Sequence, residues 1–430
     1  MILSKKEGHR WIKSKTDENE INLRKQCVEL SKSGKNISEI SVLLQRTRPW
    51  VYKWLKRSKS ADSQWYLDES KEPKAKPNKV PKKLEEHIVQ TRKKLAKRDT
   101  PQTRYAFHGA IAIHQALGNL GYKDKPNLST INRVLKRNGL IDKERRSKKA
   151  EGSKKYYPGI NAKYPGHIHQ LDLVTPRYIT GYGKNVSVNR VDVYTNQVNL
   201  NQYQSKGADS IIEFIVDDWK SFGIPGYLQL DNECSFRGSL YHPRTFGKLT
   251  RFCLNFGVEI IFIPFNEPWR NAYIESFNSR FNTQLWLFQR FTDLEHLRVE
   301  SKKFREKHSD YRAYKKEQFG KQYCAGYTKR LLPENFSFRL TTELPITKGF
   351  VHFIRWVDDK GYVNILNESF FINKELCCEY VWATINTERQ TLNIYHQATK
   401  DSKNELIKSS CYELRETVKD KIPVRKFCRV

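Results

Sequence analysis

The stretch HIHQLDLV, residues 167–174, has the pattern of a buried strand that carries one carboxylate, Asp172, among apolar side chains. A second strand pattern, GYLQLD at 226–231, ends on another carboxylate, Asp231, and a helical pattern further along the chain contains Glu275. A carboxylate is costly to bury unless it is paired or bound to a cation, so acids at these places suggest a cation site. These three acids are the candidate catalytic residues.

The region around these acids, residues 166–300, alternates strand-like and helix-like patterns. Strand patterns occur at 167–174, 185–195, 197–204, 226–231 and 258–265, and helical patterns occur at 208–223, 245–257 and 269–286. Three strands joined by short turns, followed by alternating helices and strands, predict a mixed sheet with helices packed against it.

Carboxylates that meet at one sheet edge repel one another, and this electrostatic setting binds hard divalent cations. Two such cations about 3.5–4 Å apart can activate a water or hydroxyl and stabilise the leaving oxygen in a displacement at phosphorus. The alternative is an accidental triplet among 47 acidic residues, and Asp192 is the nearest structural counterpart to Asp172. His167 and His169 are interpreted as structural, because alternation puts His169 and Asp172 on different strand faces.

Charge is the strongest feature of the composition, with 78 Lys and Arg against 47 Asp and Glu, a net charge of +31. Such a field attracts polyanions, of which nucleic acid is the commonest; an anionic membrane surface or a ribosome is the alternative. No apolar run approaches the roughly 18 residues of a membrane span, and residues 1–15 lack a secretory pattern, so we expect an intracellular protein without a membrane partner. Eight cysteines without a C-x-x-C pair argue against a zinc finger.

Residues 22–58 have the pattern of three short helices, with Ser38 as a possible cap of the second. A basic third helix after a short turn is typical of helix-turn-helix DNA binding. The residues expected to form its core are Trp50, Val51, Trp54 and Leu55. The outward residues, predicted to contact DNA, are Arg48, Lys53, Lys56 and Arg57.

A second helical unit follows at about 84–140, and Ser129 is the expected cap of its last helix. The predicted apolar face of that helix comprises Ile131, Val134 and Leu135. The predicted DNA-contacting face comprises Arg133, Lys136 and Arg137. A plain helical bundle is the alternative for either unit alone; two units joined by a basic linker favour DNA binding.

Three sequence pieces carry a family resemblance: HQLD (169–172), LQLDN (228–232) and PWRNAYIESFN (268–278). They resemble the DDE catalytic core of integrase-like transposases from bacterial insertion sequences, a group that also resembles retroviral integrases. The resemblance covers roughly residues 130–290, and PWRNAYIESFN is its most specific piece.

The resemblance implies an RNase H-like fold in which Asp172, Asp231 and Glu275 bind two Mg²⁺ (or Mn²⁺) ions. It implies metal-dependent cleavage of double-stranded DNA at element ends, then attack of the exposed 3′-hydroxyl on target DNA. A homo-oligomer and a cytoplasmic, nucleoid-associated location in a bacterium are expected on the same ground.

The chain departs from the family pattern at three places. Glu233 follows Asn232 where the family usually has Gly; it either joins the metal site or faces solvent, and we favour solvent. Asp231 and Glu275 are several residues further apart than is usual, with the extra length expected in the loop at 234–245. Ala272 replaces a frequent Gly.

Asn271, Glu275 and Asn278 share a helix face by their spacing. The two asparagines are predicted to orient Glu275 or to contact the DNA backbone; a role as exposed polar residues is the alternative.

The predicted fold class is a multidomain α/β protein with N-terminal helix-turn-helix units, an RNase H-like mixed-sheet catalytic core and a C-terminal small β-barrel. The predicted domains are a helix-turn-helix unit (1–60), a basic Lys/Pro linker (61–83), a second helix-turn-helix unit (84–145), a basic linker (146–163), the catalytic core (164–300), a helical connector (301–344), the β-barrel (345–400) and a basic tail (401–430). In the β-barrel, Arg355, Trp356 and Lys360 are candidates for contact with DNA or a partner.

The leading interpretation is a transposase. One alternative is a domesticated, non-catalytic DNA-binding protein that retains the core as a scaffold. Another is an RNase H-type nuclease, which fits the core but gives the paired helical units no role.

Overall fold

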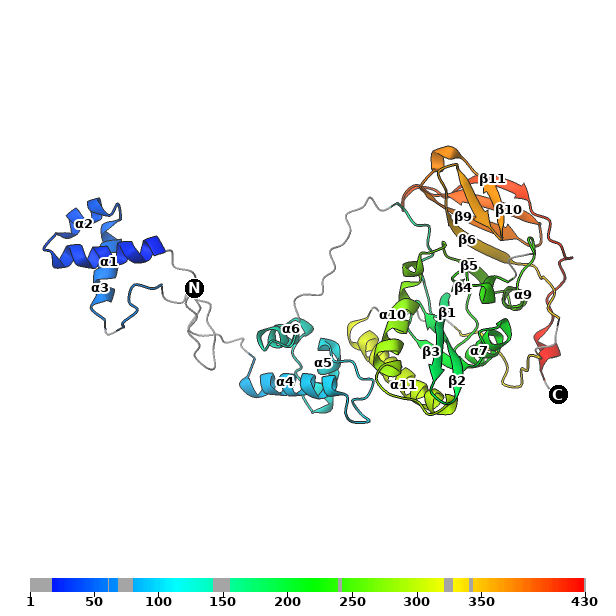
Figure 1. Ribbon diagram of the computed structural model, residues 1–430, viewed down its shortest axis with the longest axis horizontal. Coiled ribbons are helices and arrows are strands. Elements are labelled where there is room, and N and C mark those ends of the chain that lie inside the picture. The colour runs from blue at the N-terminus through cyan, green and yellow to red at the C-terminus, as the bar shows by residue number, and fades with distance from the viewer. Residues whose placement is uncertain are drawn as a thin grey trace. The chain divides into compact units, whose positions relative to one another are not determined.

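The computed structural model of the chain describes residues 18–60, 62–68, 80–141, 155–238, 242–320, 328–339 and 343–428. The chain divides into two compact units, Met1–Pro81 and Lys82–Val430 (Figure 1). About half of each predicted linker, at 61–83 and 146–163, lies outside the described residues. No helix in the described part of the chain is long and apolar enough to cross a bilayer.

The first unit is a three-helix domain, as the sequence predicts. Its helices are α1 (Glu18–Lys32), α2 (Ile37–Leu43) and α3 (Arg48–Ser58). Cys27, Ile40 and Val51, one from each helix, form its buried centre. The cap of α2 is Asn36 rather than Ser38, because the Asn36 side chain accepts from the Glu39 amide while the Glu39 side chain accepts from the Asn36 amide.

The second unit begins with three more helices, α4 (Lys82–Lys97), α5 (Ala110–Asn119) and α6 (Leu128–Arg137). The predicted apolar face of α6 is confirmed, since its three residues are buried. The predicted cap is wrong: Asn127, not Ser129, accepts from the Thr130 amide at 2.8 Å. Ser129 lies already inside the first helical turn.

A nine-stranded mixed sheet organises the rest of this unit, in the order β11-β10-β9-β6-β5-β4-β1-β2-β3. The strands of the predicted core are β1 (Ile168–Ile179), β2 (Gly183–Asp192), β3 (Val198–Tyr203), β4 (Tyr227–Leu230) and β5 (Glu259–Phe262). β1, β2 and β3 are antiparallel, whereas β4 and β5 join β1 in parallel. The predicted mixed sheet is confirmed.

Helices cover both faces of this core sheet (Figure 1). They are α7 (Ala208–Ser221), α8 (Cys234–Arg237), α9 (Lys248–Asn255), a 3₁₀ turn η1 (Pro268–Asn271), α10 (Ala272–Arg280), a π-helical turn η2 (Phe281–Trp286) and α11 (Leu294–Phe319). α7 and α9 pack on one face through Trp219 and Phe252, and α10 and α11 pack on the other through Phe277 and Phe304. α11, predicted as part of a helical connector, thus shares the hydrophobic core of this sheet.

The C-terminal strands are β6 (Phe350–Trp356), β7 (Tyr362–Ile365), β8 (Glu368–Phe371), β9 (Tyr380–Asn386), β10 (Thr391–His396) and β11 (Glu405–Cys411), with short 3₁₀ turns η3 (Lys374–Leu376) and η4 (Val424–Phe427). β6, β9, β10 and β11 form an antiparallel sheet, and β7 and β8 a separate hairpin.

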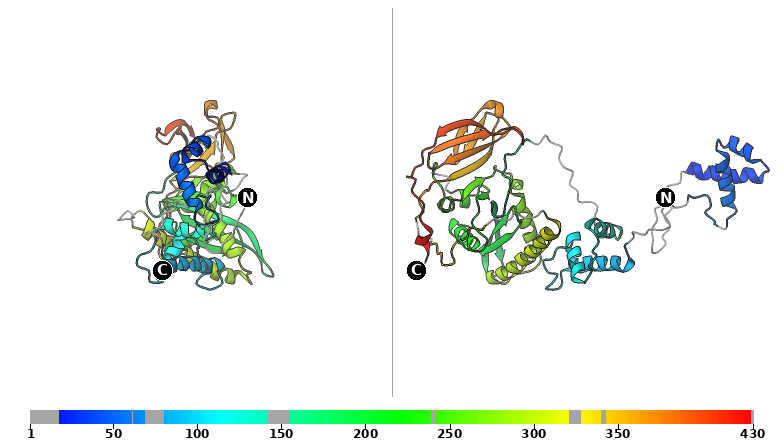
Figure 2. Two further views of the ribbon diagram at one scale, coloured as in Figure 1. Left: turned by 90° about the vertical axis from the view of Figure 1, so that its left-hand side faces the viewer. Right: turned by 180° about the vertical axis from the view of Figure 1, so that it is seen from behind.

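The predicted antiparallel character of the C-terminal region is therefore confirmed, but in the described residues its pairing is not that of a separate closed barrel. β6 pairs in parallel with β5, so the four C-terminal strands extend the core sheet, as the orange and red strands of Figure 2 also show. Pairing with β6 covers the edge that β5 would otherwise expose.

Candidate active site

Two neighbouring strands bring Asp172 and Asp231 together. β1 and β4 run parallel, with Ile168 opposite Tyr227 and Gln170 opposite Gln229. Asp172 and Asp231 each lie two residues further along the chain, Asp231 just past the end of β4. Adjacent strands lie about 4.8 Å apart and directly opposed side chains share a face, so the two carboxylates are neighbours.

A pair of glutamines fixes the helix that carries Glu275. Gln229 donates from Nε2 to Oδ1 of Asn271 at 2.7 Å, and the Ile274 amide donates to Oε1 of Gln170 at 3.1 Å. These bonds hold the start of α10 on the strand face that also carries the two aspartates. Sequence reasoning missed this pair, although both strands contain the same Gln-Leu-Asp triplet.

The Asp172 carboxylate is held by two donors. Its Oδ1 accepts from the Leu173 amide at 2.8 Å, and its Oδ2 accepts from Nδ2 of Asn278 at 2.6 Å. Asn278 in turn accepts from Nδ2 of Asn189, the residue opposite Asp172 on β2, at 2.7 Å. Ser187 donates to Oδ1 of Asn189 at 2.7 Å. Each donor in this chain points toward Asp172, which fixes the orientation of the carboxylate.

The three acids influence one another electrostatically. Burial, followed by the charges of Asp231 and Glu275, raises the pKa of Asp172 to about 7. Burial also raises the pKa of Asp231, and burial together with the Asp231 charge raises the pKa of Glu275. The charges of Asp231 and Glu275 thus reach Asp172, and the charge of Asp231 reaches Glu275.

The fourth acid, Glu233, is paired with a lysine. Nζ of Lys206 lies 2.6 Å from Oε1 of Glu233, and the Glu233 side chain is partly exposed. Its charge nevertheless contributes to the raised pKa of Asp172 and of Asp231. Glu233 thus lies at the border of the acidic site, with its charge balanced by Lys206.

The donor set fits a hard divalent cation in its chemistry, because all three predicted ligands are carboxylates. Within the described residues, however, no three His, Cys, Asp or Glu side chains converge closely enough to hold an ion. Like charges repel, so nothing draws the carboxylates together when no cation lies between them. The site therefore has the residues for a metal centre without its closed geometry.

The loop after Asp231 is held by its asparagine. Nδ2 of Asn232 donates to the Ile263 carbonyl at 2.6 Å, and Oδ1 of Asn232 accepts from Nη2 of Arg355 at 2.7 Å. Oδ1 of Asp231 accepts from the Glu233 amide at 3.0 Å. Arg355, a candidate for DNA contact from the sequence, is instead buried behind this loop.

The loop between α8 and α9, where the sequence places the extra length between Asp231 and Glu275, has its two ends close together. Gly238, with φ of 98°, meets Gly247 so closely that a Cβ on Gly238 would lie 2.7 Å from the Gly247 nitrogen. Only glycine fits there, so Gly238 and Gly247, the two ends of this excursion, lie against each other. Residues 239–241 of the excursion lie outside the described residues.

The asparagines of α10 point into the protein. Asn271 is 2% exposed, and Asn278 supports Asp172 rather than Glu275. Contact of either residue with DNA would therefore require it to give up a hydrogen bond inside the protein.

The basic residues predicted to contact DNA lie mostly on exposed surfaces. On α3, Arg48, Lys53 and Lys56 are exposed, whereas Arg57 is half-buried with its guanidinium over the Trp54 ring. On α6, Arg133, Lys136 and Arg137 are exposed. Of these, Arg137 is bound to Glu85 of α4, with Nε and Oε1 2.7 Å apart.

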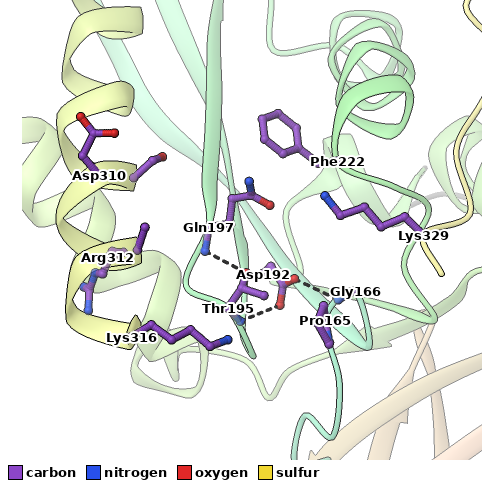
Figure 3. A pocket seen from close by; sticks show the side chains of 12 residues that line it. Pro165, Gly166, Asp192, Thr195, Gln197, Phe222, Asp310, Arg312, Lys316 and Lys329 are labelled. Carbon is purple, nitrogen blue, oxygen red and sulfur yellow. Dashed lines mark hydrogen bonds between the residues drawn. The ribbon is translucent and has the colours of Figure 1, made fainter. Parts of the chain in front are cut away.

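Asp192 is a structural acid. Its carboxylate accepts from the amides of Gly166 and Tyr194, at 2.9 and 2.8 Å, and from that of Thr195. It lines a cavity of about 400 Å³ between α11 and the β2–β3 turn, together with Lys316 (Figure 3). Asp192 lies three residues along β2 from Asn189, roughly 10 Å from the level of Asp172, so this cavity is not the acidic site.

His169 is buried on the strand face opposite Asp172. Burial, then the charges of Arg190 and Lys329, lowers its pKa well below the usual value, so it is neutral. This placement agrees with a structural role.

Two family models match the chain. Residues 256–313 match the integrase core domain, and residues 21–64 match a homeodomain-like domain. The chain thus carries an integrase core domain behind a homeodomain-like domain, as the resemblance implies. The core match includes Glu275 and ends before the C-terminal strands. No curated protein matches the chain.

The solved structures that the chain matches include retroviral integrases. The magnesium complex of the HTLV-2 integrase catalytic core domain, in its dimeric form, is 16% identical with a TM-score of 0.24, over 33% of this chain and 85% of that one. An intasome of simian T-cell lymphotropic virus with the PP2A regulatory subunit B56 gamma is 12% identical with a TM-score of 0.29, over 70% of this chain and 96% of that one. At such TM-scores the likeness carries no functional argument.

Proposed function

We propose that this protein is a transposase or integrase that binds the ends of a mobile DNA element, cleaves them and joins them to target DNA. Asp172, Asp231 and Glu275 are its catalytic residues and the ligands of two Mg²⁺ or Mn²⁺ ions. The observation that carries the proposal is the parallel pairing of β1 with β4, in which Gln170 lies opposite Gln229, two residues before Asp172 and Asp231 respectively. The integrase core match and the +31 charge support DNA as the substrate.

The residues divide the work as follows. Asp172 and Asp231 would supply carboxylate oxygens from β1 and from the end of β4, and Glu275 would supply a third carboxylate from α10. Asn278 keeps Oδ2 of Asp172 in place. Bound ions would activate the attacking oxygen and stabilise the leaving oxygen. With its pKa near 7, Asp172 is partly protonated at neutral pH and gives up that proton on metal binding.

DNA recognition belongs to the helical units. The exposed basic face of α3 contacts element-end DNA, and that of α6 contributes further phosphate contacts, because basic side chains on an exposed helix neutralise backbone charge. Asn271 and Asn278 rank below these basic residues as candidates for DNA contact, since both make hydrogen bonds inside the protein. Joining two DNA ends requires two active sites, so we expect the protein to act as a homo-oligomer. We expect it to act in the bacterial cytoplasm, on DNA of the nucleoid.

The test uses purified full-length protein and labelled element-end DNA. We expect nicking that depends on Mg²⁺ or Mn²⁺, that disappears in Asp231→Asn, and that persists in Asp310→Asn, whose carboxylate is exposed on α11. Binding of the same DNA should survive in both variants. Specific binding without nicking in either metal would sink the proposal.

That outcome would favour the second candidate function, a non-catalytic DNA-binding protein that retains the core as a scaffold. The homeodomain-like match at residues 21–64 supports that function without requiring the acidic site.

A further inference from the structure

Arg355 of β6 is a buried cation whose acceptors are neutral. It is 2% exposed, and burial, followed by the charge of Arg237, lowers its pKa to about 9. Its guanidinium donates to the carbonyls of Ile263, Ile354 and Asn364, each at 2.9 Å, and to Oδ1 of Asn232 at 2.7 Å. Burying a charge is costly, and these hydrogen bonds to neutral acceptors offset part of that cost.

The contact with Asn232 reaches the proposed metal site. Asn232 follows Asp231 directly and is gripped at both ends of its amide, by Arg355 and by the Ile263 carbonyl. Since both amide atoms are engaged, the backbone at the end of β4 has little freedom. Arg355 thereby fixes the backbone position from which the Asp231 side chain extends.

A second contact from the C-terminal strands reaches the turn before the Glu275 helix. The Tyr380 hydroxyl of β9 donates to Oε1 of Glu267 at 2.8 Å and accepts from Nη2 of Arg270 at 2.9 Å. Arg270 also donates from Nε to Oε2 of Glu267 at 2.8 Å. These residues lie in and just before η1, which leads directly into α10.

Taken together, two of the three carboxylates depend on strands that the integrase core match does not include. Arg355 supports the loop of Asp231, and Tyr380 supports the start of the Glu275 helix. Asp172, in contrast, is supported from β1, β2 and α10.

We propose that the C-terminal sheet is a structural part of the metal site, with Arg355 and Tyr380 as positioning residues for Asp231 and Glu275. This inference rests on the proposed function. Loss of either contact lets one carboxylate drift from its partners, and metal affinity falls while the fold persists. Removal of an outer support of a metal ligand typically weakens affinity 10–100-fold.

The test measures Mn²⁺ affinity of the full-length protein by titration, with the metal-free melting temperature recorded beside it. Tyr380→Phe removes only the hydroxyl and keeps the ring against Trp356 and Tyr157. Arg355→Lys keeps the charge but not the fork of donors. Tyr362→Phe, a partly exposed tyrosine on β7, is the matched control.

We expect roughly 10–100-fold weaker Mn²⁺ binding in Tyr380→Phe and Arg355→Lys and unchanged binding in Tyr362→Phe. Metal-free Tyr380→Phe should remain folded, with a melting temperature lowered only by the loss of the two hydroxyl hydrogen bonds. The double variant Asn232→Ala/Arg355→Lys should bind Mn²⁺ no more weakly than the weaker-binding of the two single variants. Both substitutions remove the same contact, so their effects should not add.

Two results overturn the inference, and they differ. Wild-type protein that binds Mn²⁺, with equal affinity in Tyr380→Phe and Arg355→Lys, overturns the inference alone. Wild-type protein that binds no Mn²⁺ overturns the proposed function and this inference with it.

Discussion

Asn278 donates a 2.6 Å hydrogen bond from Nδ2 to Oδ2 of Asp172, and its own Oδ1 accepts from Asn189. The second bond fixes which end of the Asn278 amide faces the carboxylate. A donor fixed in this way holds Asp172 in one orientation and favours its ionised form. This support crosses from α10 to β1 and β2, so it joins the helix of Glu275 to the strand of Asp172.

The first prediction concerns this bond. Asn278→Ala should lower metal-dependent nicking roughly 10–100-fold, because the ligand carboxylate loses its orienting donor. Ser279→Ala, at the next and exposed position of α10, is the control and should match the wild type. Nicking rates at saturating DNA measure the effect. Equal rates for both variants would show that Asn278 does not orient the carboxylate.

The second prediction concerns pH. Because the pKa of Asp172 is raised to about 7, the native metal-free protein holds a proton that the unfolded chain releases near pH 4. Ionising Asp172 therefore costs stability, progressively between about pH 4 and 7, by at most about 4 kcal/mol. The free energy of unfolding of Asp172→Asn, relative to that of the wild type, should increase from about pH 4 to pH 7 and stay constant above pH 7.

Melting temperatures of both proteins at pH 5 to 8, in a chelator, measure this difference. The comparison matters because buried histidines such as His308, whose pKa burial lowers to about 3, impose the opposite slope on both proteins. The hydrogen bond lost in Asp172→Asn adds an offset that does not depend on pH. A difference that stays constant with pH would contradict a raised pKa at Asp172.

Part of this site could be predicted from the sequence. The order of strands and helices follows from apolar periodicity, and the acids stand out because each interrupts or ends such a pattern. Periodicity does not encode which strands pair, so the placement of β6 beside β5, far along the chain, was not predictable. The inward roles of Asn271 and Arg355 depend on that placement and on long-range contacts.

The helix caps were missed for a local reason. At α2 and at α6 the sequence offers a serine and, two residues earlier, an asparagine. Both residue types are good caps, so propensity does not choose between them. The structure uses Asn36 and Asn127, since the side chain of each reaches the third amide of the helix.

The third prediction concerns the buried ion pair of Arg190 and Asp218. Nε of Arg190 lies 3.0 Å from both carboxylate oxygens, and both residues are buried. Asp218→Ala should lower the free energy of unfolding by about 3–5 kcal/mol, because it leaves a buried guanidinium unpaired. Urea denaturation measures it, with the exposed neighbour Asp217→Ala as control. Equal unfolding midpoints for the two variants would contradict a structural pair.

The fourth prediction concerns the contact between the second helical unit and the core. The Phe107 ring stacks on Tyr311 of α11 with centroids 3.4 Å apart, and Arg280 of α10 lies over the same ring. Phe107→Ala should weaken this contact by on the order of 2 kcal/mol. Hydrogen exchange should accelerate in α4–α6 but not in β1–β5. Leu120→Ala, an exposed apolar residue of the same unit, is the control, and unchanged exchange in both would contradict the contact.

The last prediction compares two basic residues that the sequence analysis predicts equally to contact DNA. Lys56 of α3 is exposed, whereas Arg137 of α6 is bound to Glu85. A side chain that contacts a phosphate releases a counterion, so Lys56→Ala should reduce the slope of log affinity against log salt by about 0.9. Arg137→Ala should change that slope less, because its charge is already balanced by a carboxylate. Binding of element-end DNA by the full-length protein, measured over a range of salt concentrations, gives both slopes. A larger change of slope in Arg137→Ala than in Lys56→Ala would contradict the assignment of α3 as the main DNA-contacting helix.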